Sequence, residues 1–215
     1  MEKILFGFFS FTLTGKSSLV ASLMRMPEPH GQILIDGQNI QQLSLQSYRS
    51  KISVIPQDPV LFSGPLRLNL DPETQFEDAQ IWNALEAVQL KSLVQERDKE
   101  LHYEISEGGT NFSVGEKQLL CLARALLQEN KIIILDEATA NVDFATDRLI
   151  QETIRSKFDR CTVITIAHRV DTILDYDRVL VLEGGEVVEF DKPKVLLRNE
   201  KGKFAELCRL QHPVT

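Results

Sequence analysis

Short apolar runs recur along this chain and are separated by stretches whose apolar residues follow a helical period. Runs of about four to eight residues, bounded by turn-forming residues, predict strands. They cover residues 4–9, 32–35, 52–55, 131–135, 162–166 and 178–182. Because helical stretches lie between most of them, the pattern predicts an α/β fold with a mainly parallel sheet.

Two of these runs predict strands at the centre of the sheet. Residues 132–135 and 163–166 are apolar almost throughout instead of alternating, as expected of strands that helices cover on both faces. Near the end of the chain, the dipeptide Gly184-Gly185 separates two strand-like stretches, at residues 179–183 and 186–190. This arrangement predicts a β-hairpin.

The stretch from residue 65 to about residue 128 holds no convincing strand and predicts helices, interrupted at Asp71-Pro72 and Gly108-Gly109. Ser113 is predicted to begin the last of these helices, because Ser113 and Glu116 form the S-x-x-E pattern of a capping box. We therefore expect one domain with a helical subdomain at residues 65–128, inserted between two core strands.

Size and charge narrow the classes of function. A chain of 215 residues with 43% hydrophobic residues fits one domain with a sizeable core. A net charge of -7 argues against a nucleic-acid partner, because surfaces that bind nucleic acid carry clustered Lys and Arg. Because the three cysteines are widely spaced, we expect them to be reduced thiols and not to form a metal site. No apolar run approaches the roughly 20 residues of a membrane span, so the chain alone is expected in the cytosol.

A phosphate-binding loop is predicted between the first strand and the helix that follows it. In such a loop, backbone N–H groups point at the phosphates, a lysine reaches the β and γ oxygens, and a hydroxyl binds Mg²⁺. The end of that pattern is matched by Gly15, Lys16, Ser17 and Ser18. Ser10 stands where the pattern has its first glycine, so the match is incomplete. By itself, Gly-Lys-Ser also fits an ordinary helix start.

Adjacent carboxylates follow the apolar run that ends at Leu135. The carboxyl ends of parallel strands are where α/β folds place their ligands. Asp136 would hold Mg²⁺, directly or through water, and Glu137 would orient and deprotonate an attacking water. The same pair also fits a solvated turn or a helix cap.

Further polar residues lie next to predicted strands and helix starts. Gln57 and His168 each follow a strand, where the amide would reach Mg²⁺ or water and a neutral imidazole would bond to a γ-phosphate. Ser113 and Gly115 lie at a helix N-terminus, whose N–H groups and positive dipole end favour an anion. Each of these residues, taken singly, also fits a structural role.

As an ordered set, these motifs resemble the nucleotide-binding domain of an ABC transporter, from about Gly15 to the C-terminus. The phrases PVLFSG at 59–64, NLDP at 69–72 and NFSVG at 111–115 resemble the C subfamily, the multidrug-resistance-associated proteins. Within that subfamily the second nucleotide-binding domain is the closer match, because the first commonly lacks the acidic residue that stands here as Glu137.

The resemblance implies a P-loop NTPase core, with ATP and Mg²⁺ as cofactors and ATP hydrolysis as the activity. The implied roles are ATP binding by Gly15, Lys16, Ser17, Ser18, Ser113 and Gly115, Mg²⁺ binding by Ser17, Gln57 and Asp136, and catalysis by Gln57, Glu137 and His168. The implied partners are a second nucleotide-binding domain, joined head to tail, and the transmembrane domains of an exporter of organic anions or drug conjugates. The domain would then lie at the cytoplasmic face of a membrane.

Departures from the family pattern leave a second hypothesis open. Ser10 and Leu13 replace glycines of the phosphate loop, and Glu116 stands where the family usually has Gln. Only nine residues precede Ser10, so we expect the domain to be N-terminally incomplete. The alternative is therefore a non-catalytic interaction module that has lost nucleotide affinity. A soluble ATPase of DNA repair or translation would carry a coiled-coil insertion or a second motif set, and this sequence has neither.

Overall fold

A computed structural model of the chain describes residues 4–10, 16–167 and 169–211, with the side chains of residues 9, 10, 16 and 17 left out. The chain divides into two compact units. The first unit comprises Met1–Ser53, Lys131–Glu137 and Cys161–Thr215, and the second comprises Val54–Asn130 and Ala138–Arg160. Each unit is therefore assembled from segments that are distant in the sequence.

Within the described residues, the main sheet has six strands in the order β10-β9-β1-β8-β7-β4. Their bounds are β1 Ile4–Ser10, β4 Ile52–Ile55, β7 Ile132–Asp136, β8 Thr162–Ile166, β9 Arg178–Glu183 and β10 Glu186–Asp191. Strand β1 pairs in parallel with both β8 and β9, β7 pairs in parallel with β8, and β10 is antiparallel to β9. The expected α/β fold with a mainly parallel sheet is confirmed, and so is the hairpin at Gly184-Gly185.

The centre of the sheet is apolar on both faces. Ile133, Ile134 and Leu135 are consecutive in β7 and all are buried, as are Val163 and Ile166 in β8. Successive side chains of a strand point to opposite faces, so burial of three in a row requires cover on both. This explains why these runs do not alternate in the sequence.

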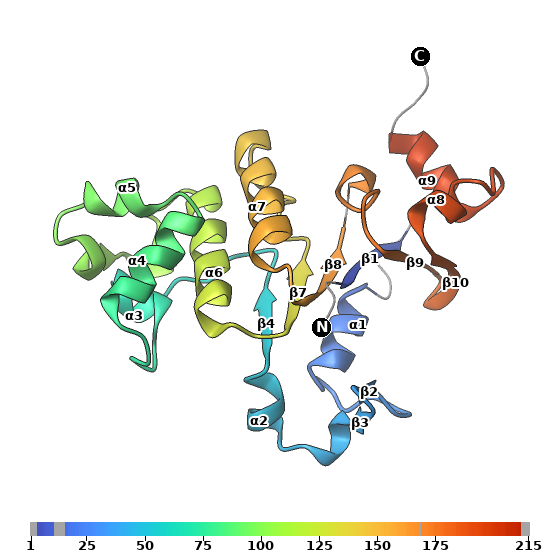
Figure 1. The fold of residues 1–215 in the computed structure, drawn as a ribbon, viewed down its shortest axis with the longest axis horizontal. Coiled ribbons are helices and arrows are strands. Elements are labelled where there is room, and N and C mark those ends of the chain that lie inside the picture. Colours follow the sequence, from blue (N-terminus) through green and yellow to red (C-terminus); the bar gives the residue numbers. More distant parts are fainter. Residues whose placement is uncertain (1–3, 11–15, 168, 212–215) are drawn as a thin grey trace. The chain divides into compact units, whose positions relative to one another are not determined.

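Helix α1 (Lys16–Leu23) packs on this sheet in the first unit. Its residues Val20 and Leu23 lie against a buried cluster that includes Ile134 of β7 and Tyr48 of α2 (Leu45–Arg49). At the other end of the sheet, α8 (Pro193–Leu196) and α9 (Lys203–Gln211) lie beside β10 (Figure 1). The described part of the chain contains no helix long and apolar enough to span a bilayer.

The strand expected at residues 32–35 is shorter than predicted. Only Leu34–Ile35 (β2) is extended, and it pairs with Gln38–Asn39 (β3). Asp36 and Gly37 between them have φ values of +49° and +77°, as in the two-residue turns that suit hairpins. Gly31, with φ +89°, breaks the extended backbone on the other side.

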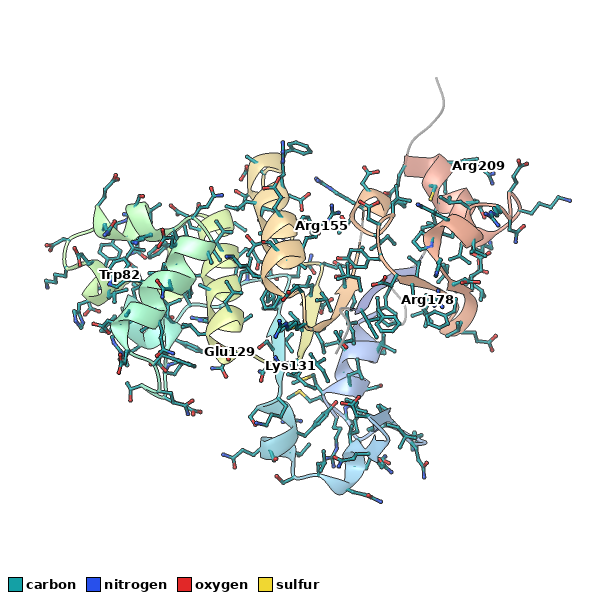
Figure 2. All side chains as sticks on the ribbon, viewed as in Figure 1. Trp82, Glu129, Lys131, Arg155, Arg178 and Arg209 are labelled. Atoms are coloured by element: carbon teal, nitrogen blue, oxygen red, sulfur yellow. The ribbon has the colours of Figure 1, made fainter. Side chains whose placement is uncertain are left out.

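The second unit is mainly helical. Its helices are α3 Leu66–Leu70, α4 Asp78–Ala87, α5 Lys91–Gln95, α6 Val114–Gln128 and α7 Phe144–Lys157. Trp82, the only tryptophan of the chain, lies on α4 (Figure 2). The expectation of no strand in this region is wrong, because β5 (Gly64–Pro65) pairs with β6 (Glu104–Ile105). Strands of two residues are too short to produce a period in the sequence.

Helix α6 begins as predicted. Ser113 is its N-cap residue, and the Ser113 Oγ accepts a 3.2 Å hydrogen bond from the backbone N of Glu116. The Glu116 carboxylate returns a 2.6 Å contact by accepting from the Ser113 N. These reciprocal bonds confirm the capping box and satisfy two amides that no helical carbonyl reaches.

The C-terminus of α1 ends in a Schellman motif. Arg25 has φ +53°, and its N donates to the carbonyl of Ser22 at 3.0 Å. The N of Met26 donates to the carbonyl of Ala21 at 2.7 Å, which completes the motif. Left-handed backbone costs a residue with a β-carbon about 1–2 kcal/mol, so other contacts must offset the strain at Arg25.

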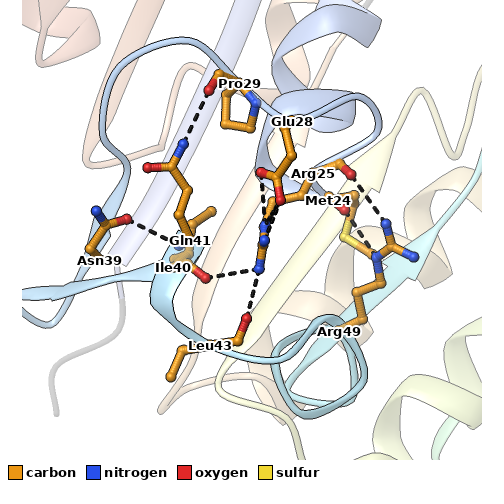
Figure 3. Close-up of polar contacts among 9 residues, drawn as sticks. All are labelled: Met24, Arg25, Glu28, Pro29, Asn39, Ile40, Gln41, Leu43 and Arg49. Carbon is orange, nitrogen blue, oxygen red and sulfur yellow. Dashed lines mark hydrogen bonds and ion pairs between the residues drawn. The ribbon is translucent and has the colours of Figure 1, made fainter.

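Side chains of α2 bond to the last carbonyls of α1. Arg49 donates from Nε to the carbonyl of Met24 at 3.0 Å and from Nη2 to that of Arg25 at 3.2 Å (Figure 3). The Tyr48 hydroxyl donates to the carbonyl of Leu23 at 2.7 Å. A cation at this end also complements the negative pole of the helix dipole. The helix that starts at Lys16 is therefore anchored at its far end.

The Arg25 side chain ties the same end of α1 to the next turn. It forms an ion pair with Glu28 and donates from Nη1 to the carbonyls of Ile40 and Leu43 at 3.0 and 2.8 Å (Figure 3). Bonding to Glu28 is the main cause that raises the pKa of Arg25 above its ordinary value.

We expect Arg49→Met to lower the free energy of unfolding by about 1–3 kcal/mol, because two carbonyls lose a charged donor. Urea denaturation followed by circular dichroism measures this. The control is Arg148→Met on α7, where an exposed pair with Glu152 is worth at most about 1 kcal/mol. Equal effects of the two substitutions would contradict the anchoring role of Arg49.

Candidate functional site

Three parallel strands reach one edge of the sheet, where β7 and β8 end level with each other and β1 runs two residues further. Phe8 of β1 pairs with Ile166 of β8, and Ile166 pairs in turn with Asp136 of β7. Because the strands are parallel, their carboxyl ends face the same edge, where open α/β sheets bind ligands. Glu137 and Ala167, the residues that directly follow β7 and β8, therefore lie at this edge.

Two backbone hydrogen bonds continue the ladder past the strand ends. The N of Glu137 donates to the carbonyl of Ile166 at 3.1 Å, and the N of Ala167 donates to the carbonyl of Phe8 at 3.1 Å. Ala167 is buried. The sheet therefore fixes the backbone on which Glu137 lies and the residue that immediately precedes His168.

Glu137 has a backbone conformation that residues with a β-carbon seldom adopt. Its φ is +50°, in the left-handed region, which costs about 1–2 kcal/mol. Such strained residues cluster at functional sites, where the surrounding structure holds them in place. At Glu137, the strand on one side and the hydrogen bond to Ile166 provide that hold.

The helix after β1 starts close to the predicted phosphate loop. Lys16 is the first residue of α1, and the helix contacts both β1 and β7. Ser18, the third residue, is exposed, and its carbonyl accepts from the Ser22 hydroxyl at 2.7 Å. Gly15 and His168 lie outside the described residues, as do the side chains of Lys16 and Ser17.

The side chains at this edge suit Mg²⁺ bound together with phosphates. Asp136 and Glu137 are half-buried, and their carboxylates are oxygen donors of the kind Mg²⁺ prefers. No cluster of three or more His, Cys, Asp or Glu residues among those described could hold a metal alone. Mg²⁺ commonly takes one or two carboxylates and completes its shell with water and substrate phosphates.

The other predicted site residues belong to the second unit. Gln57 is exposed, two residues after the end of β4. Its carbonyl and that of Pro56 each accept a 2.9 Å hydrogen bond from the Nε2 of Gln118. Ser113 is exposed at the N-terminus of α6. Sequence analysis missed Gln118, since neither a motif nor a periodicity distinguishes it from other polar residues of a helix.

Gly115 brings α6 and α7 close together. A β-carbon at this position would lie 3.1 Å from the side chain of Thr146 in the first turn of α7. Asp143 caps α7, accepting from the backbone N of Ala145 and of Thr146 at 3.0 Å and from the Thr146 hydroxyl at 2.7 Å. Bonding to Thr146 is the main cause that lowers the pKa of Asp143 below its ordinary value. Gly115 therefore has a packing role whether or not it contacts a ligand.

Comparison with known proteins gives a consistent set of matches. The model of the family described as "ABC transporter" matches residues 14–140. The human protein "ATP-binding cassette sub-family C member 4" is 50% identical over 208 residues, which is 97% of this chain and 16% of that protein. "Probable multidrug resistance-associated protein lethal(2)03659" of Drosophila melanogaster is 53% identical over 202 residues, 94% of this chain and 15% of that protein.

Solved structures agree. The "Structure of a bacterial Atm1-family ABC exporter with ATP bound" superposes with a TM-score of 0.89 and 31% sequence identity. The superposition covers 97% of this chain and 37% of that one. The chain thus spans only a small part of the length of each relative it matches.

Proposed function

The chain belongs to the ABC transporter family, and we propose that it binds and hydrolyses ATP to power export by a transporter of the multidrug-resistance-associated kind. The observation that carries the proposal is the sheet edge at which β7 and β8 end level beside β1. In support, α1 contacts both β1 and β7, and the pair Asp136 and Glu137 lies at the carboxyl end of β7.

For nucleotide binding, we assign the phosphates to the start of α1. Lys16 would neutralise phosphate charge, and Gly15 and Ser18 would offer backbone N–H groups at the positive end of the helix. Ser17 and Asp136 would hold Mg²⁺, with Gln57 as a further oxygen ligand. The bound ion would bridge phosphate oxygens and offset the charge that develops on them.

For hydrolysis, we assign the proton transfer to Glu137. Its carboxylate would accept a proton from the attacking water and hold that water in line with the γ-phosphate. The strained backbone at φ +50° supports this assignment, because it fixes the direction in which the side chain leaves the sheet. His168 would bond to the γ-phosphate, and Gln57 would help to orient the water.

The proposed partner is a second nucleotide-binding domain arranged head to tail. Ser113 and Gly115 at the start of α6 would then contact the nucleotide of that partner. In support, Ser113 is exposed and α6 is a helix of 15 residues whose first turn is fixed by the capping box. Transmembrane domains of an exporter of organic anions or drug conjugates would complete the assembly, with this domain on the cytoplasmic side.

We expect the purified chain to bind MgATP with a Kd between micromolar and low millimolar, measured by isothermal titration calorimetry. Lys16→Ala should weaken binding about 10- to 100-fold, since hydrogen bonds to charged groups are worth about 1.5–3 kcal/mol. Circular dichroism checks that both proteins are folded. A folded chain that binds no MgATP would contradict the proposal and favour a non-catalytic interaction module.

We expect Glu137→Gln to lower the turnover number for ATP by about 10²- to 10⁴-fold, the range that general-base catalysis supplies. Binding of MgATP should stay within about threefold, because the amide keeps the size of the side chain. Release of phosphate under saturating MgATP measures turnover. Unchanged turnover would show that another group accepts the proton.

A further inference from the structure

One face of α6 holds the segment that runs from Pro56 to Asn69 in the second unit. Gln118 donates from Nε2 to the carbonyls of Pro56 and Gln57, both at 2.9 Å. Six residues further along the helix, Arg124 donates to the backbone carbonyl of Asn69 and, at 2.9 Å, to that of Val60. The path of this segment therefore follows α6 through side chain to backbone bonds.

The amide of Gln118 can face Gln57 in only one orientation. Both partners are carbonyl oxygens, which accept but cannot donate, so the NH₂ group must point toward them. The side chain is 1% exposed, and its Oε1 accepts no hydrogen bond from any residue that the structure describes. A buried polar atom without a partner is unfavourable, so the bonds to Pro56 and Gln57 are what makes a polar residue tolerable here.

The backbone that enters Gln57 is restricted from two sides. The ring of Pro56 limits its own φ to about -65°. Gln118 fixes the next two carbonyls, and with them the peptide planes on both sides of Gln57. The Gln57 side chain is exposed and keeps its rotamer freedom. The position of its Cα, from which the side chain extends, is fixed by the bonds from Gln118 of α6.

We propose that Gln118 is a positioning residue that fixes the backbone of Gln57 relative to Ser113. The two predicted ligands are connected to one helix, because Ser113 caps α6 and Gln118, which bonds to the Gln57 backbone, lies five positions further along it. This inference rests on the proposed function, in which Gln57 serves the nucleotide of its own domain and Ser113 that of the partner. A shift of α6 on contact with the partner's nucleotide is then transmitted through Gln118 to Gln57.

The test replaces the donor but keeps the volume. Gln118→Met has about the same length and no N–H group. Its control is Leu120→Met, a volume-conserving change at a fully buried position of the same helix. Backbone ¹³C NMR compares the carbonyl signals of Pro56 and Gln57 with those of α6 in each variant. Phosphate release under varied MgATP gives kcat and KM.

In Gln118→Met, we expect the carbonyl signals of Pro56 and Gln57 to shift, because both carbonyls lose their donor, while those of α6 stay in place. The kcat should fall about 10- to 100-fold with KM within about threefold, because displacement of a catalytic group by about 1 Å reduces turnover rather than ground-state binding. Leu120→Met should match the unsubstituted chain. The conservative variant Gln118→Glu keeps one donor when its carboxyl is protonated, so its kcat should lie between that of Gln118→Met and that of the unsubstituted chain. It replaces the Met variant if that variant does not fold.

Other outcomes separate this inference from the proposed function. Normal kcat in folded Gln118→Met, or unchanged carbonyl signals of Pro56 and Gln57, would overturn the positioning role and leave the proposed function standing. Shifted carbonyl signals throughout the chain would also overturn it, because Gln118 would then be no more than a stabilising residue. Absence of MgATP binding by the unsubstituted chain would remove the proposed function, and the positioning role with it.

Discussion

The parallel register of β1, β8 and β7 is the constraint on which the candidate site depends. Phe8, Ile166 and Asp136 are level across the three strands, so the carboxyl ends of β7 and β8 lie at one edge beside β1. A shift of one residue in this register would turn every side chain of the shifted strand to the opposite face. Continuous burial along β7 and β8 specifies the strands as central, and the ladder bonds at Glu137 and Ala167 specify how they end.

Each compact unit carries its own means of fixing polar groups. In the first unit, α1 is held at its C-terminal end by Tyr48 and Arg49, while its N-terminal end contributes Lys16. In the second unit, α6 is capped at Ser113 and holds the Gln57 segment through Gln118. In both units, a residue assigned to the nucleotide lies at the N-terminal end of a helix. Bonds between side chains and backbone carbonyls, further along the chain, connect that helix to its neighbours.

Much of this could be predicted from the sequence because the signals are local. Apolar runs located the strands of the main sheet, and the spacing of Ser113 and Glu116 located the start of α6. The chemistry of Asp136 and Glu137 followed from their place after an apolar run, and their assignment to catalysis and Mg²⁺ binding stays a prediction.

The remaining features depend on geometry that no local pattern records. Gln118 became evident only because the fold brings residues 61 and 62 positions apart in the sequence into contact. The left-handed backbone of Glu137 reflects the bond to Ile166, and nothing in its side chain indicates a positive φ. The strands β5 and β6 are too short for a period, and their pairing joins distant segments of the second unit.

The central claim is that the carboxyl ends of β1, β7 and β8 in the first unit form the nucleotide site. It is tested most directly by ¹⁵N–¹H NMR of the chain titrated with MnATP, since Mn²⁺ replaces Mg²⁺ and broadens nearby amide signals. The account predicts that the amides of Ser18, Glu137 and Ala167 broaden first and that an excess of MgATP restores them. Broadening centred elsewhere in a folded chain, or none at saturating MnATP, would contradict the account.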